Sequence, residues 1–238
     1  MPASSDTTWE QHRTLGQQAA KREEYERALQ HFLEAGTKLS QQMEPDAPEL
    51  RQKVESMAAL QFNIGQLCAR LAATRDEPSF FDRALHFLQQ AERSAASVES
   101  KTLPHILNAE GDVYFQKDDL AQAVACYESA LQLGPEASPQ EQSVWHHNLA
   151  LTHCILGAHE AMLSHMEQSL KLLVSVEAFG EMALQLANLA ALVETTGEVE
   201  LALKLYVRAY QLAQLWSDRD EELYATLEAH IERLSEAV

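Results

Sequence analysis

The chain has 238 residues, 46% of them hydrophobic and 23% charged, a balance typical of a globular protein rather than a disordered one. Its 36 Asp and Glu against 18 Lys and Arg give a formal net charge of -18, and this field argues against nucleic-acid binding because it repels phosphate backbones. The 3 cysteines form no CxxC pair, and no long apolar run or signal-peptide core occurs. We therefore expect a cytoplasmic chain without disulfides or a membrane span.

Along the chain, five segments each carry a helical pattern around one small residue. When that residue is numbered zero, positions −4, −1 and +3 share its helical face, because residues three and four apart stack. We expect these faces to be buried. In chain order they are Leu15, Gly16 and Ala19; Ile64, Gly65 and Cys68; Leu107, Gly111 and Tyr114; Leu149, Ala150 and His153; and Leu186, Leu189, Ala190 and Val193.

A second helix follows each of these segments, with a small, a large and a small residue at +12, +16 and +19. The series reads Ala28, Phe32, Ala35 in the first unit, Ala123, Tyr127, Ala130 in the third and Ala202, Tyr206, Ala209 in the fifth. In the second unit Ala84, Leu88, Ala91 comes seven residues late, and the fourth has Met162, Met166, Ser169. Small residues at zero and +12 let two helices approach closely, and the large residue fills the space between them.

These residues resemble the tetratricopeptide-repeat family, most clearly in the third unit, EGDVYFQKDDLAQAVACYESALQLGP. The resemblance covers nearly the whole chain, although the repeats are further apart than the family's spacing of about 34 residues. It implies an all-α, right-handed superhelical solenoid of antiparallel helix hairpins. We predict one domain over residues 1–238, with repeats at about 6–43, 47–98, 101–134, 139–176 and 178–216 and a capping helix at about 217–237.

The resemblance also implies a concave groove, lined by the first helix of each repeat, that binds a peptide or protein segment. Carried onto this sequence, the groove residues are Arg13, Gln17, Phe62, Asn63, Gln66, His105, Asn108, Asp112, Phe115, His147, Asn148, Leu151 and Asn188. We expect Phe62, Phe115 and Leu151 to be apolar anchors. Three asparagines, Asn63, Asn148 and Asn188, recur at −2, where an amide can pair with the backbone of an extended peptide. Alternatively, these asparagines bridge or cap neighbouring helices.

Other kinds of site match the sequence less well. The family's clamp for a C-terminal carboxylate is partly matched by Arg13, Gln17 and Asn63, but His105 and Ala109 stand where it needs cations. Five histidines in the fourth unit lack the i, i+4 spacing usual for zinc, so we expect no metal and no cofactor. No phosphate loop, HExxH or GxSxG motif occurs.

We therefore predict a non-enzymatic adaptor that binds a protein or peptide in its groove, and the acidic composition favours a basic partner. Two alternatives stay open at this point. One is a peptide-sensing regulatory or chaperone domain. The other is a scaffold that assembles with copies of itself.

Overall fold

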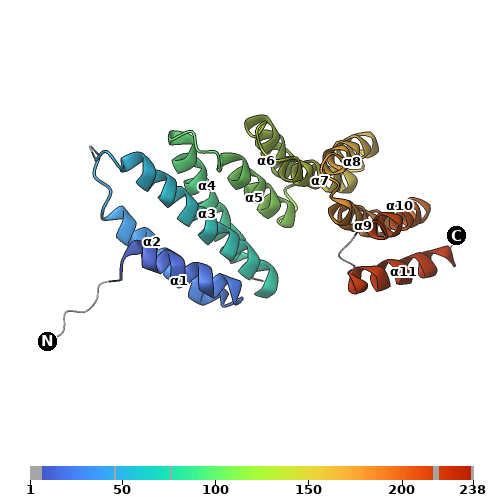
Figure 1. The fold of residues 1–238 in the computed structure, drawn as a ribbon, viewed down its shortest axis with the longest axis horizontal. Coiled ribbons are helices and arrows are strands. Elements are labelled where there is room, and N and C mark those ends of the chain that lie inside the picture. Colours follow the sequence, from blue (N-terminus) through green and yellow to red (C-terminus); the bar gives the residue numbers. More distant parts are fainter. Residues whose placement is uncertain (1–6, 46, 76, 217–219, 237–238) are drawn as a thin grey trace. The chain divides into compact units, whose positions relative to one another are not determined.

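The computed structural model describes residues 7–45, 47–75, 77–216 and 220–236. These residues form eleven α-helices and no strand (Figure 1). The helices are α1 (Trp9–Lys21), α2 (Tyr25–Ser40), α3 (Leu50–Arg75), α4 (Ser79–Ser97), α5 (Leu103–Gln116), α6 (Leu120–Leu133), α7 (Pro139–Ile155), α8 (His159–Val174), α9 (Phe179–Thr195), α10 (Val199–Ala213) and α11 (Glu221–Ser235). The predicted limits at residues 6, 217 and 237 lie outside the described residues.

Successive helices pack as hairpins: α1 with α2, α3 with α4, α5 with α6, α7 with α8 and α9 with α10. Contacts group the chain into two compact units, Met1–Leu133 with α1 to α6 and Gly134–Val238 with α7 to α11. In the first unit α3 also packs on α2, and α5 on α4. In the second, α11 packs on α10. The all-α helical-repeat fold is therefore as predicted.

Local sequence signals set several helix starts. Thr8 accepts a hydrogen bond from the backbone N–H of Gln11, whose side chain accepts one from the N–H of Thr8. Ser138 and Glu141 form the same reciprocal cap at α7. Such caps satisfy backbone N–H groups that have no partner in the first helical turn.

Close approach of the two helices in a hairpin explains the glycines at the zero position. A Cβ atom on Gly16 would lie 2.9 Å from the ring of Phe32, and one on Gly65 would lie 2.6 Å from Cγ of Leu88. On Gly111 it would lie 2.5 Å from the ring of Tyr127. The large residue of the second helix thus occupies the space that the missing side chain leaves, as the spacing predicts.

The expectation of a buried face is wrong for Leu15, which is 38% exposed. Its counterparts at −1, Ile64, Leu149 and Leu189, are buried. The reason is the absence of a neighbour: α3 and α5 each pack on the hairpin before them, but no described helix precedes α1. Tyr114 and His153 are also only half-buried. The ring of His153 stacks on that of His165 with a centroid distance of 5.5 Å.

The last helix, α11, is held to α9 and α10 by polar as well as apolar contacts. Leu227 is fully buried in the core of the second unit. Arg233 donates a hydrogen bond of 2.6 Å to Glu194 of α9, and the hydroxyl of Tyr210 donates one of 2.8 Å to Glu228. This helix therefore covers apolar surface of the α9–α10 hairpin.

Candidate functional site

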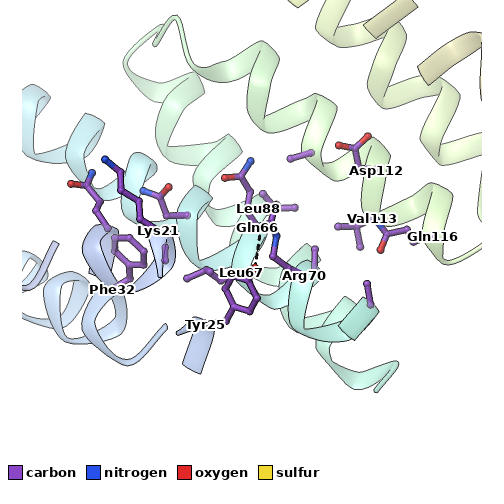
Figure 2. A pocket seen from close by; sticks show the side chains of 16 residues that line it. Lys21, Tyr25, Phe32, Gln66, Leu67, Arg70, Leu88, Asp112, Val113 and Gln116 are labelled. Carbon is purple, nitrogen blue, oxygen red and sulfur yellow. Dashed lines mark hydrogen bonds between the residues drawn. The ribbon is translucent and has the colours of Figure 1, made fainter. Parts of the chain in front are cut away.

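A pocket of about 730 Å³ lies in the first unit, between α1, α2, α3 and α5, with Leu88 contributed by α4 (Figure 2). Its lining residues are Gln17, Ala20, Lys21, Tyr25, Phe32, Asn63, Gln66, Leu67, Ala69, Arg70, Ala73, Leu88, Ala109, Asp112, Val113 and Gln116. Four of the predicted groove residues, Gln17, Asn63, Gln66 and Asp112, thus share one pocket.

Repeat register explains which side chains line this pocket. Gln17, Gln66 and Asp112 all stand at +1 of their repeats, on α1, α3 and α5. Lys21, Arg70 and Gln116 stand at +5 of the same helices and line it too. Residues four apart share a helical face, so each of the three helices contributes two consecutive turns. The equivalent face of three successive repeats therefore meets at one site.

The apolar wall of the pocket comes from the core beneath it. Phe32 and Leu88, which fill the space over Gly16 and Gly65, form the floor of the pocket while being only 2% and 0% exposed, and Leu67 and Val113 extend this floor. All four belong to the hydrophobic core of this unit. A few polar groups above a preformed apolar wall are the usual composition of a ligand site.

Two charged groups of the pocket, Arg70 and Asp112, are each held in place by a tyrosine. Arg70 donates a hydrogen bond of 3.3 Å to the hydroxyl of Tyr25, and its guanidinium carbon lies 5.5 Å from the centroid of that ring (Figure 2). Asp112 accepts hydrogen bonds from the hydroxyl of Tyr127 at 2.8 Å and the amide of Asn108 at 3.2 Å. Burial raises the pKa of Asp112 to about 6, although the bond from Tyr127 acts in the opposite direction. With Lys21 and Arg70, the pocket has two cations against one carboxyl group, in a chain of net charge -18.

Other predicted residues of the first unit lie outside this pocket lining. The guanidinium carbon of Arg13 lies 5.3 Å from the ring centroid of Trp9. Phe62 is half-buried against the core, and Asn108 acts through its bond to Asp112. His105 and Phe115 are half-buried.

The predicted residues of the second unit differ in burial. His147 is 6% exposed, and burial lowers the pKa of its ring to about 4. Leu151 packs against the core, Asn148 is half-buried and Asn188 is exposed. A separate hollow of about 330 Å³ in this unit is lined mainly by apolar residues of α8, α9 and α10 and includes none of the predicted residues.

Sequence reasoning missed Lys21, Tyr25, Arg70 and Gln116. Three of the four were detectable, because they follow the predicted +1 residues by one helical turn. Tyr25 was not detectable in this way, since it enters from the start of α2.

Comparisons with known proteins agree with this architecture. Residues 104–137, which include α5 and α6, match the family model described as "Tetratricopeptide repeat". BtubC (BKLC) from P. vanneervenii is similar in structure, with a TM-score of 0.61 and 17% sequence identity over 90% of this chain and 84% of that chain. A Podosopora anserina protein described as a kinesin light chain with nearly identical TPR-like repeats has a TM-score of 0.64 and 13% sequence identity over 89% of this chain and 97% of that chain. The apo form of RapI has a TM-score of 0.63 and 14% sequence identity over 96% of this chain and 63% of that chain. No curated protein matches the sequence.

The chain is thus an α-helical repeat protein. More narrowly, residues 104–137 match a tetratricopeptide repeat, and the fold is similar to that of proteins with TPR-like repeats, in agreement with the resemblance seen in the sequence. Sequence identities of this size establish the fold alone. In the part of the chain that the structure describes, no helix is long and apolar enough to cross a membrane.

Proposed function

We propose that the chain is a non-catalytic adaptor whose first unit binds a segment of a partner protein in the pocket between α1, α3 and α5. The observation that carries this proposal is the repeat register of the lining: the +1 and +5 side chains of three successive repeats meet at one hollow. Repeat proteins build extended binding surfaces in this way, because each repeat presents the same face to the same side.

The lining favours a particular ligand chemistry. An apolar side chain of the partner would pack on the half-buried Ala20, Tyr25 and Ala69 above the buried floor of the pocket, where it removes apolar surface from water. The amides of Asn63 and Gln66 each offer a donor and an acceptor to the partner's backbone. The basic partner expected from composition rests on the whole-chain charge, whereas Lys21 and Arg70 favour a carboxylate at the pocket itself. We therefore propose a segment with an apolar residue next to an acidic group.

A comparative capture experiment tests this proposal. Tagged wild-type chain and the variants Asn63→Ala and Arg70→Ala are used to capture proteins from a lysate, and each recovered protein is quantified by mass spectrometry. A genuine partner should be depleted at least about fivefold by either variant, which corresponds to losing about 1 kcal/mol of binding free energy per polar contact.

Gln132→Ala is the matched control, because Gln132 is an exposed amide side chain of α6 in the same unit but does not line the pocket. The control should recover the wild-type set of proteins. Circular dichroism and thermal unfolding confirm that each variant is folded. If folded Asn63→Ala and Arg70→Ala both recover every protein at the wild-type level, the pocket is not the binding site.

A further inference from the structure

Three potential metal ligands converge on the first hairpin, away from the pocket. His12 of α1 faces His31 and Glu34 of α2. Nδ1 of His12 lies 2.9 Å from Oε2 of Glu34 and 3.4 Å from Nδ1 of His31. Nδ1 of His31 lies 3.9 Å from the same Oε2. Each side chain thus directs one donor atom to a common point.

These distances match the edges of a coordination polyhedron. Tetrahedral Zn²⁺ with bonds of about 2.0–2.2 Å to nitrogen and oxygen separates its ligand atoms by about 3.3–3.5 Å. The observed edges of 2.9, 3.4 and 3.9 Å bracket that range. An ion just above the plane of the triangle, on the side of a fourth ligand, therefore requires displacements of only a few tenths of an ångström, within the reach of side-chain torsions.

Neighbouring groups orient the ligands, and one side of the cluster is open to solvent. Gln30 donates a hydrogen bond of 3.1 Å to Oε1 of Glu34, which leaves Oε2 for the histidines. Neighbours of this kind fix the orientation of metal ligands. The side chains of His12 and His31 are 12% and 19% exposed and that of Glu34 is 41% exposed, so solvent reaches the cluster from the Glu34 side.

The fourth hairpin provides an internal comparison. His146 and His165 stand at the same −4 and +15 positions of their repeat as His12 and His31, and their Nδ1 atoms lie 3.0 Å apart. The position equivalent to Glu34 is Gln168. An amide is a weaker ligand than a carboxylate for a divalent cation, so only the first hairpin has a complete set of three.

We propose that His12, His31 and Glu34 bind a divalent transition-metal ion, best matched by Zn²⁺, with the fourth position left to water. Two imidazoles and one carboxylate are a donor set that zinc prefers. Binding requires both Nδ1 atoms to be unprotonated, so any proton that either atom carries passes to solvent when the ion binds. The ion then joins α1 to α2. None of the three ligands lines the peptide pocket, so this site is independent of the proposed adaptor function.

Metal titration of the tag-free full-length chain tests the proposal. The chain is stripped of metal with a chelator and titrated with Zn²⁺ by calorimetry, and Co²⁺ is added separately as a probe whose visible absorption reports tetrahedral coordination. We expect one Zn²⁺ per chain and a rise in melting temperature that grows with Zn²⁺ concentration, because the ion binds the folded state. Glu34→Gln, which copies the fourth hairpin, should weaken binding at least about tenfold.

His31→Gln should abolish the Co²⁺ absorption, whereas the matched variant His165→Gln in the fourth hairpin should bind Zn²⁺ as wild type does. Circular dichroism of each metal-free variant checks folding, and the partly exposed Glu34 supplies a decisive variant even if His31→Gln unfolds. The proposal is overturned if the wild type binds no Zn²⁺. It is also overturned if folded Glu34→Gln binds Zn²⁺ with undiminished affinity, since the ion would then lie elsewhere.

Discussion

Glu110 lies in an environment that is unusual for a carboxyl group. It stands at −1 of the third repeat, where the other four repeats carry Leu15, Ile64, Leu149 and Leu189, and it is 4% exposed. Its Oε1 atom is buried without a hydrogen-bond partner. Burial, followed by the charge of Glu92, raises the pKa of Glu110 to about 8. An aliphatic position of the repeat is thus occupied by a carboxylic acid that stays protonated at neutral pH.

The raised pKa of Glu110 predicts a loss of stability on the alkaline side. Between its ordinary value of 4.5 and about 8 the folded chain keeps the proton that the unfolded chain has lost, so the free energy of unfolding falls as pH rises through this interval. In urea unfolding, wild type should lose about 1–3 kcal/mol more than Glu110→Gln between pH 6 and pH 8.5. The exposed control Glu128→Gln should follow wild type. Parallel curves for wild type and Glu110→Gln would contradict the prediction.

Gly111 is the tightest of the zero positions, and its substitution should be costly. In Gly111→Ala the added methyl meets the ring of Tyr127, which is itself fixed by its hydrogen bond to Asp112. Overpacking of about 1–3 kcal/mol should outweigh the gain of about 1 kcal/mol in helix propensity. Gly36→Ala is the contrast: Gly36 also lies within a helix, but its nearest contact is 4.0 Å away, so stability should rise. Thermal unfolding of both variants measures the difference, and equal shifts would refute this reading of Gly111.

At the scale of the element, the hairpin is the part of the fold that sequence predicts best. The zero, +12 and +16 positions identify which helices pair and which large residue lies between them, because this packing is local in sequence. The exposure of Leu15 was not predictable from its own repeat, since it depends on the absence of a described helix before α1. The sequence did not predict the cluster of His12 and His31 for another reason. These residues are 19 positions apart, and it is the hairpin that brings them together.

The fourth hairpin should become a metal site when its missing ligand is supplied. His146 keeps a neutral ring near pH 7, because burial and the neighbouring His165 lower its pKa to about 4. Gln168→Glu then adds the carboxylate that Glu34 provides in the first hairpin, and the number of Zn²⁺ ions bound should rise from one to two. The double variant Glu34→Gln, Gln168→Glu should retain one. Calorimetric stoichiometry decides the matter, and a value that stays at one in Gln168→Glu would show the two hairpins to be inequivalent.

At the scale of the molecule, the division into two compact units raises the question of whether each unit folds without the other. The first unit, Met1–Leu133, has its own hydrophobic core and encloses the whole pocket. We predict that residues 1–133, expressed alone, give a helical circular dichroism spectrum and unfold cooperatively on heating. A fragment that melts without a cooperative transition would instead favour the single domain over residues 1–238 expected from the sequence.

The candidate site was predictable only in part, because its extent depends on contacts between repeats. Gln17, Asn63, Gln66 and Asp112 follow from repeat register, and they do line one pocket. Register alone does not give the extent of a hollow, which depends on how far apart neighbouring helices lie above buried residues such as Phe32. Repeat register also does not tell which repeats contribute to a pocket. The remaining candidates, including Asn148 and Asn188 of the second unit, stay predictions.

The two cations in the pocket have a consequence for the rate at which a partner binds. A segment carrying a carboxylate approaches a chain of net charge -18, so at long range it is repelled, and only at contact does it meet Lys21 and Arg70. Added salt screens the repulsion over a Debye length of about 10 Å at 0.1 M and also weakens the contact. Association and dissociation should therefore both accelerate with ionic strength, and the equilibrium constant should change less than either rate.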